Sequence, residues 1–430
     1  MLPNRLQTAA NTAAIYAAAL CLLVAPFRGT TGLRAALLVL AMLFIAVAAA
    51  VRREWRWLLP PPRMVRNSVA VWALALLAGS LMTSNHWRAL DSWKGDVLTP
   101  LLALLVFYAL TNTEADMKRW LKILFFGLIG LTSFAIWNVF VPVDTVTMPA
   151  FGGMGPYSTW LVTLCALLPL AWAWVPPGSR IARVLTICAM VLILLSALLT
   201  TVRAIWICFG IMLLVFAAIS YYISRREQRN DQRKMRQLAA LVLVGSALFS
   251  ALFFAATEWR FNGNPPGGGG AIEMLTHDNR GIIWHEAMAL ITEAPITGYG
   301  YGREVLAETM TARFSTPLDK ALFKQAHNIV LNQVLQIGVI GGVLILAVFA
   351  SLLSCFTSMI RRDDRSETLT RTVGLCGVLL VVGIFARNMV DDFFIRQNAI
   401  LFWAIVGMLL GLGMKRGGGE LRCAREAVRN

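Results

Sequence analysis

Long apolar runs separated by short polar segments dominate the chain, and the length of the runs is the first clue to the fold. A helix of roughly 20 apolar residues crosses a hydrocarbon core about 30 Å thick. Twelve runs of that kind can be marked: 10–27, 33–51, 67–84, 96–111, 119–142, 157–175, 181–200, 203–223, 238–256, 328–357, 371–389 and 395–414. The pattern therefore predicts an all-α integral membrane protein with about 12 transmembrane helices.

One polar insert, residues 257–327, interrupts this pattern and divides the chain. Nine predicted membrane helices precede the insert within 1–256, three follow it within 328–414, and a charged tail covers 415–430. The composition supports a membrane protein, because 58% of the residues are hydrophobic and only 14% are charged, whereas a soluble domain carries about 25% charged residues. We therefore expect the chemistry in the insert or at the membrane surface that it covers.

The insert has a helical pattern of its own. Apolar residues recur at helical spacing at Ile283, Trp284, Ala287, Met288 and Ile291. Asp278 suits the N-cap of this helix and Pro295 ends it, and the glycines of 298–302 suit a tight turn. The insert is thus expected to contain short amphipathic helices that lie on the membrane or cover the bundle.

The formal net charge of +16 could indicate either nucleic-acid binding or membrane orientation. The placement of the basic residues favours membrane orientation. Of the 39 lysines and arginines, 26 lie in alternate polar segments that include both ends of the chain, and 13 lie on the opposite side. The positive-inside rule then places both termini in the cytoplasm and the insert on the far side. We expect no nucleic-acid partner, and contact with anionic membrane lipids is a lesser possibility.

His327 has the most informative surroundings of any polar residue. It immediately precedes the tenth predicted span, where the positive end of the helix dipole favours a neutral imidazole that accepts a proton. Asn328, Asn332 and Gln336 follow at every fourth position and form one polar stripe that descends into the membrane. Polar residues at that depth face a bundle interior or a wet cavity. We interpret His327 as catalytic and Asn328 and Asn332 as substrate-binding.

Two arginines on the same side of the membrane are candidates for binding an anion. Arg203 lies at the tip of the hairpin between the seventh and eighth spans, on the side where basic residues are disfavoured. Arg280 lies in the first turn of the helix predicted in the insert, where free N–H groups and the helix dipole already attract an anion. We expect Arg203 and Arg280 to bind a lipid phosphate.

A metal site is the alternative that the sequence offers at the outer surface. Asp91 and Asp96 follow the third span, and two acids at this position are suited to a divalent cation. No other acidic cluster accompanies them. We therefore expect no metal and no cofactor.

These motifs, in this order, resemble the O-antigen ligase and polymerase superfamily of bacterial envelope glycosyltransferases. The resemblance rests on Arg280-Gly-Ile-Ile-Trp284, Pro295-Ile-Thr-Gly-Tyr-Gly300, His327-Asn328-Ile-Val-Leu331 and the hairpin Thr201-Val-Arg203-Ala-Ile-Trp206. It covers most of residues 150–345, and the first four spans contribute little. The chain departs from the family where Val202-Arg203-Ala204 replaces the more usual Ser-Arg-Gly, which weakens the placement of that arginine slightly.

The resemblance implies a GT-C-like membrane glycosyltransferase of the bacterial inner membrane with a periplasmic active site. The donor would be a glycan on undecaprenyl diphosphate, and for a ligase the acceptor would be lipid A–core oligosaccharide. His327 would act as the general base, Arg203 and Arg280 would stabilise the diphosphate, and the transfer would invert the anomeric centre without a metal.

Three other functions stay open. A repeat-unit polymerase and a protein O-oligosaccharyltransferase of the same superfamily would use the same histidine and arginines. A secondary transporter has a similar number of spans, but no inverted repeat is visible and the ionisable residues gather at one face rather than at the midplane.

Overall fold

The computed structural model describes residues 2–27, 29–52, 62–140, 154–176, 178–200, 202–226, 280–313, 324–362, 368–392, 394 and 396–427, and within these ranges it contains helices and no strands. The helices, in chain order, are α1 (Leu2–Val24), α2 (Thr31–Arg52), α3 (Arg63–Leu81), α4 (His86–Trp93), the π-helical turn η2 (Lys94–Leu98), α5 (Thr99–Leu110), α6 (Glu114–Phe140), α7 (Met154–Cys165), α8 (Leu168–Ala173), α9 (Arg180–Thr200), α10 (Arg203–Arg226), α13 (Arg280–Glu293), α14 (Arg303–Thr311), α16 (Ile329–Ile360), α17 (Thr368–Val390) and α18 (Arg396–Ala427).

Ten helical segments of the described residues are long and apolar enough to cross a membrane. They correspond to ten of the twelve expected spans. Of the other two, 238–256 lies outside the described residues, and 119–142 falls on α6, a 27-residue helix with acidic residues in its first turn. An all-α membrane protein is therefore confirmed, whereas the number twelve stays a prediction.

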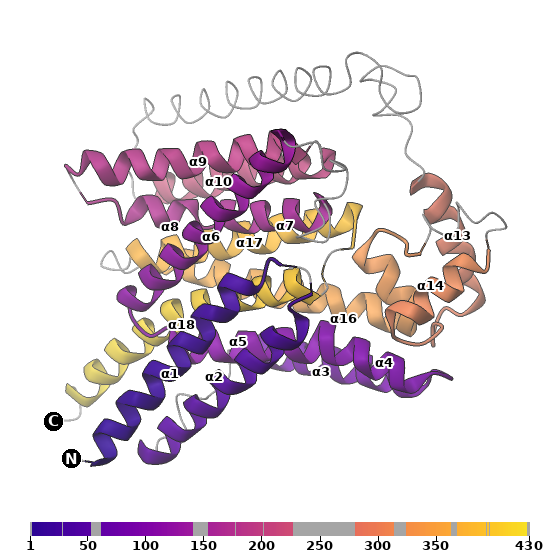
Figure 1. Cartoon of the computed structure of the whole chain (residues 1–430), viewed down its shortest axis with the longest axis horizontal. Helices are drawn as coiled ribbons and strands as arrows, with labels where there is room; N and C mark the ends of the chain where they lie inside the picture. Colours follow the sequence, from indigo (N-terminus) through magenta and orange to yellow (C-terminus); the bar gives the residue numbers. More distant parts are fainter. Residues whose placement is uncertain are drawn as a thin grey trace.

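The two ends of the helix bundle differ in what they carry. Both chain termini lie at one end, and α13 and α14 stand at the opposite end (Figure 1). This arrangement agrees with the expectation that the insert lies across the membrane from both termini. The compartment that each end faces stays a prediction.

Helix α18 forms the centre of the bundle. Its residues 398–413 are all buried, as expected for a helix that is apolar on every side. Aromatic side chains fix its first turns, since the ring of Phe402 lies 5.2 Å from those of Phe394 and Trp403, measured between centroids. This packing anchors the short α17–α18 connection, residues 391–395, at the end of the bundle that carries the insert.

The insert docks onto a break in α16. Ile337 and Gly338 leave the helical conformation, and Gly338 has a φ of +70°. The broken turn exposes backbone groups that need new partners, and the chain leading from α13 to α14 supplies them. Tyr299 and Gly300 donate N–H bonds to the carbonyls of residues 335 and 336 at 2.9 and 2.8 Å, and Val339 donates to Pro295 at 2.8 Å. A backbone ladder therefore joins the insert to a membrane helix.

The amphipathic face predicted for α13 covers protein. Ile283, Ala287 and Leu290 are buried and form one apolar cluster with residues of α14 and α16. Met288 was expected in the same stripe, but it is half exposed, because it lies on the edge that turns away from the cluster. The expected N-cap, Asp278, lies outside the described residues.

Candidate active site

His327 sits in a strained turn directly before α16. Asn328 is the N-cap of that helix, and its side-chain oxygen accepts the N–H groups of Val330 and Leu331 at 2.9 and 3.1 Å. The Asn328 amide nitrogen donates to the carbonyl of Met389 at 3.1 Å, which joins the start of α16 to the end of α17. His327 itself has a φ of +49°, a conformation that non-glycine residues adopt rarely, most often at functional sites.

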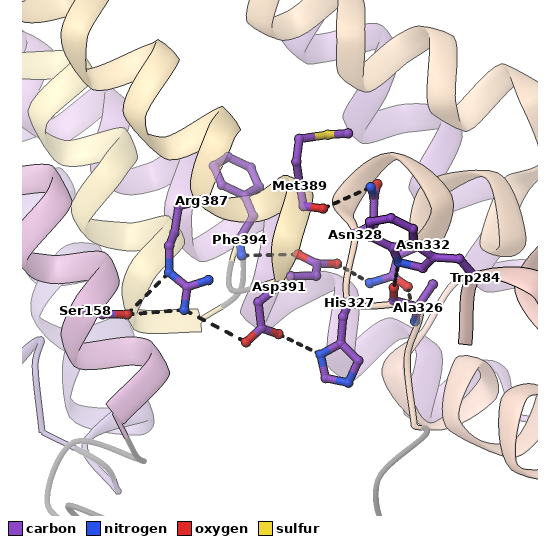
Figure 2. A network of polar contacts seen from close by, with 11 residues as sticks. Ser158, Trp284, Ala326, His327, Asn328, Asn332, Arg387, Met389, Asp391 and Phe394 are labelled. Atoms are coloured by element: carbon purple, nitrogen blue, oxygen red, sulfur yellow. Dashed lines mark hydrogen bonds and ion pairs between the residues drawn. The ribbon is translucent and has the colours of Figure 1, made fainter. Parts of the chain in front are cut away.

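A carboxylate that directly follows the neighbouring helix α17 orients the His327 ring. Nδ1 of His327 lies 2.8 Å from an oxygen of Asp391, the first residue after α17 (Figure 2). The second oxygen of Asp391 lies 3.9 Å from the guanidinium of Arg387, one turn earlier on α17. Arg387 is 1% exposed and donates to the hydroxyl of Ser158 on α7. Four side chains from three segments thus form one polar chain that ends at His327.

The chemistry of the pair fixes the tautomer of the histidine. An ionised carboxylate only accepts hydrogen bonds, so Nδ1 carries the proton that is donated to Asp391. In the neutral ring the lone pair is then on Nε2, which faces away from Asp391 (Figure 2). If Nε2 takes a proton, the negative charge of Asp391 stabilises the imidazolium that forms. This arrangement suits a general base.

A second set of contacts holds the same segment in place. Asn332 donates to Asp392 at 2.6 Å and accepts the N–H of Ala326 at 2.8 Å, while Trp284 of α13 donates to the Ala326 carbonyl at 2.9 Å (Figure 2). The residues on both sides of His327 are therefore hydrogen-bonded to helices.

The two asparagines that were predicted to bind substrate have structural contacts, and their binding of substrate stays a prediction. Both amide groups are engaged with the protein itself, Asn328 as a helix cap and Asn332 as a bridge to Asp392. The polar stripe begun by these residues faces protein: Gln336 accepts the N–H of Gly302 at 3.2 Å.

Burial raises the pKa of the Asp392 carboxyl. Hydrogen bonds from Asn332 and from the backbone N–H of Phe394 oppose this shift, and the nearby charge of Asp391 adds to it. Two adjacent acids therefore differ in environment, because Asp391 is paired with a histidine and an arginine whereas Asp392 is fully enclosed.

The two predicted arginines lie at the same end of the bundle as His327. Arg280 is the first residue of α13, and its charge is close enough to act electrostatically on Arg387. Arg203 is the first residue of α10, and two residues separate it from Thr200, the last residue of α9. The tight hairpin is thus as expected, whereas the side chain of Arg203 lies outside the described residues.

The acidic pair proposed as an alternative metal site is engaged in ion pairs. Asp91 contacts Lys94 at 2.7 Å, and Asp96 pairs with Arg303 of α14. Within the part of the chain that the structure describes, no three histidine, cysteine or acidic side chains are grouped so that they could hold a metal ion.

Comparison with known families identifies the central part of the chain. Residues 188–346 match the family model described as O-antigen ligase. This match supports membership of the O-antigen ligase superfamily. A comparison with curated proteins finds no match. The matched region of the chain contains His327, which the sequence predicted to be catalytic, and Arg203 and Arg280, which it predicted to bind a lipid phosphate.

Sequence reasoning missed the residues that are linked to His327. Asp391, Arg387 and Ser158 lie outside the matched region 188–346 and far from His327 along the chain. One signal was available: Asp391 and Asp392 are adjacent acids in a short connection that the charge pattern puts on the same side of the membrane as the insert. A buried arginine one turn before them, on a membrane helix, is a second signal.

Proposed function

We propose that this protein is an O-antigen ligase that transfers O-antigen polysaccharide from undecaprenyl diphosphate to lipid A–core oligosaccharide at the periplasmic face of the inner membrane. The observation that carries the proposal is the His327–Asp391–Arg387 chain at the end of the bundle that bears the insert. The match of residues 188–346 to the O-antigen ligase family model supports the reaction class. The site supports a proton-transfer role for His327.

His327 acts as the general base at the acceptor. Its Nε2 takes the proton of the acceptor hydroxyl as the oxygen attacks the anomeric carbon of the donor, a contribution typically worth about 10²–10⁴ in rate. Asp391 holds the ring in the required tautomer and stabilises the imidazolium. Arg387 on α17 holds Asp391 in place through their ion pair.

The arginines act at the leaving group. As the new C–O bond forms, the bond from the anomeric carbon to the diphosphate oxygen breaks, and undecaprenyl diphosphate leaves with the electron pair. Arg280 and Arg203 stabilise the charge that develops on the diphosphate. Attack from the face opposite the leaving group inverts the anomeric centre. Two guanidinium groups supply the positive charge, so we propose that the transfer requires no metal ion.

A transfer assay with separate donor-binding measurements tests the base. We expect His327→Ala and His327→Gln to lose transfer by about 100-fold or more, while the affinity for undecaprenyl-diphosphate glycan stays near that of the wild type. Glutamine keeps a hydrogen bond to Asp391 but has no basic nitrogen. The matched control is His285→Gln, because His285 is exposed on α13 of the same insert. An active His327→Gln enzyme would remove the base role.

The same assay tests the anion site. Arg280→Ala is expected to weaken donor binding as well as transfer, and Arg280→Lys to rescue poorly, since an ammonium lacks the planar fork of donors. Arg313→Ala is the control, because Arg313 pairs with Glu293 at the surface. Addition of EDTA is expected to leave the wild-type rate unchanged, and a loss of activity that divalent metal restores would contradict metal-independent transfer.

The lipopolysaccharide of a deletion strain separates a ligase from a polymerase. A ligase deletion leaves lipid A–core without O-antigen while the lipid-linked polymer accumulates. A polymerase deletion instead leaves single repeat units attached to the core. We expect the first banding pattern.

A further inference from the structure

A second buried charge lies at the same end of the bundle and has no place in the reaction described above. Asp96 is in the middle of the π-helical turn η2, and its side chain is 4% exposed. π-Helical turns within membrane or soluble helices are rare and frequently accompany functional sites. Here the wider turn places a carboxylate inside the protein, between α14 and the start of α18.

Asp96 binds two separate parts of the structure. One oxygen accepts the Nε–H of Arg303 at 2.8 Å, and the other is paired with a terminal nitrogen of the same guanidinium. That second oxygen also accepts the backbone N–H of Arg396 at 3.2 Å. Arg396 has a φ of +43° and, with His327, is one of the two non-glycine residues with positive φ among those described. Asp96 therefore holds the strained first residue of α18.

The contact with Arg396 bears on the segment that carries Asp391. Residues 391–395 join α17 to α18, so Asp391 begins this connection and Arg396 follows it as the first residue of α18. Between them, Asp392 accepts the N–H of Phe394 at 3.2 Å and is bound by Asn332 of α16. The connection is thus fixed at its far end by Asp96. At its near end it is fixed by His327, which pairs with Asp391, and by Asn332, which binds Asp392.

The contact with Arg303 brings in the insert. Arg303 is the first residue of α14, directly after Gly302, whose N–H is bound by Gln336 of α16. The buried hydroxyl side chain of Tyr301 lies within the electrostatic field of both Asp96 and Arg303. Arg303 also acts electrostatically on Asp392. One ion pair therefore connects the insert, the α4–α5 segment and the α17–α18 connection.

We propose that Asp96 is a positioning residue for the transfer reaction: it holds the α17–α18 connection and α14 together so that Asp391 is presented to His327 in the geometry that general-base catalysis needs. The inference rests on the proposed function. Asp96 touches none of the reacting groups and acts through Asp391.

A double-mutant cycle on transfer rate tests the proposal. The proteins are the full chain in detergent or nanodiscs, as wild type, Asp96→Asn, Asp391→Asn and the double variant, assayed with undecaprenyl-diphosphate glycan and lipid A–core oligosaccharide. We expect Asp96→Asn to lower the rate at saturating substrate by about 10-fold to 100-fold, the loss typical of a small misplacement of a catalytic group, with the KM for the donor within about twofold of wild type. The double variant should be no slower than Asp391→Asn alone, because residues that act as a unit are not additive.

Two further variants keep the test decisive. Asp91→Asn is the matched control, an acid-to-amide change one turn earlier whose side chain is 75% exposed and paired with Lys94; it should transfer at the wild-type rate. If Asp96→Asn does not fold, Arg303→Lys keeps a positive charge beside Asp96 while losing the two-point contact, and its rate loss should likewise vanish in the Asp391→Asn background.

The outcomes separate this inference from the proposed function. A wild-type rate for Asp96→Asn, or a double variant whose loss is the product of the two single losses, would overturn the positioning role. If instead Asp391→Asn and His327→Ala both transfer at the wild-type rate, the proposed function itself fails.

Discussion

His327 combines an unusual backbone with a fixed side chain, and this combination is the strongest residue-level sign of a reaction site. A left-handed conformation at a non-glycine residue costs of order 1–3 kcal/mol and persists only where surrounding contacts enforce it. The contacts that enforce it here are the Asn328 cap, the Asn332 bridge to the Ala326 N–H and the Asp391 pair. The strain is therefore offset by the same residues that orient the imidazole.

The adjacent acids Asp391 and Asp392 provide a matched pair for testing this assignment. Asp391→Asn removes the charge that stabilises the imidazolium and permits the wrong tautomer, so transfer should fall by about 100-fold or more. Asp392→Asn, which changes the neighbour that binds Asn332, should have a clearly smaller effect on the rate. The measurement is the transfer rate at saturating donor. Equal losses in the two variants would contradict a specific role for Asp391.

Asp392 also predicts a pH dependence of stability. Its pKa is raised by burial, so the folded protein binds this proton more tightly than the unfolded chain, whose Asp pKa is about 3.9. Asp392 therefore costs stability above its raised pKa, and the cost is relieved as pH falls through the window between the two pKa values. The melting temperature of the wild type relative to Asp392→Asn should rise as pH is lowered from neutral into that window. A difference that does not change with pH would show that the carboxyl is not perturbed.

At the scale of elements, the break in α16 matters most, because it is where the insert is attached to the membrane bundle. A continuous helix would satisfy its own backbone groups and offer none to the chain between α13 and α14. The φ of +70° at Gly338 is accessible to glycine without steric cost. A Cβ at this position would also overlap the carbonyl of Ile296.

Gly338→Ala should therefore loosen the insert. The conformation of Gly338, with φ +70° and ψ −171°, is essentially confined to glycine and costs an alanine of order 1–3 kcal/mol, and the overlap with Ile296 adds about 1–3 kcal/mol. We expect a lower melting temperature in detergent and faster tryptic cleavage within the insert. Gly127→Ala on α6 is the control, since a Cβ there meets no atom within 4 Å. Unchanged proteolysis of Gly338→Ala would mean that the ladder to α16 does not hold the insert.

The elements that the sequence predicted well are those whose signal is local. The apolar runs predicted the membrane helices, and the periodicity from Ile283 to Ile291 predicted α13, because each pattern reflects which side of one helix is buried. The break at Gly338 was not predicted, since a glycine in an apolar run is also tolerated within a straight helix. The break is caused by the contact of α16 with Pro295 and Ile296. These two residues lie in another segment, so the sequence of α16 alone does not reveal the contact.

In the candidate site, too, the local features were predicted from the sequence and the long-range contacts were not. His327 was found from its place before a membrane helix and the polar residues after it, which are local facts. Its contact with Asp391 joins residues far apart in the chain, and so does the contact of Arg387 with Ser158. Such pairings depend on how the helices pack, and a single sequence does not reveal them. The sequence alone shows no partners for the amides of Asn328 and Asn332. In the fold, both amides are hydrogen-bonded to other residues of the protein.

At the scale of the whole molecule, the site is assembled where four parts of the chain meet at one end of the bundle. Ser158 comes from α7, Arg387 and Asp391 from the end of α17, and His327 from the start of α16, with α13 beside them (Figure 2). The opposite end carries both termini (Figure 1). A site at one membrane surface suits a reaction between two lipid-anchored substrates, since both present their head groups at that surface.

The orientation of the bundle is the prediction on which the biological reading depends. The basic residues alternate so that the end with the termini faces the cytoplasm, and the end with α13 then faces the periplasm. Thr292→Cys places a thiol on the exposed side of α13, and Ala115→Cys places one at the exposed start of α6, next to the basic residues Lys118 and Arg119. In intact spheroplasts a membrane-impermeant maleimide should label Thr292→Cys above the background of the unmodified protein and leave Ala115→Cys unlabelled. Both should react after lysis. Labelling of Ala115→Cys alone in intact spheroplasts would invert the molecule and place His327 in the cytoplasm, where a periplasmic ligase reaction is impossible.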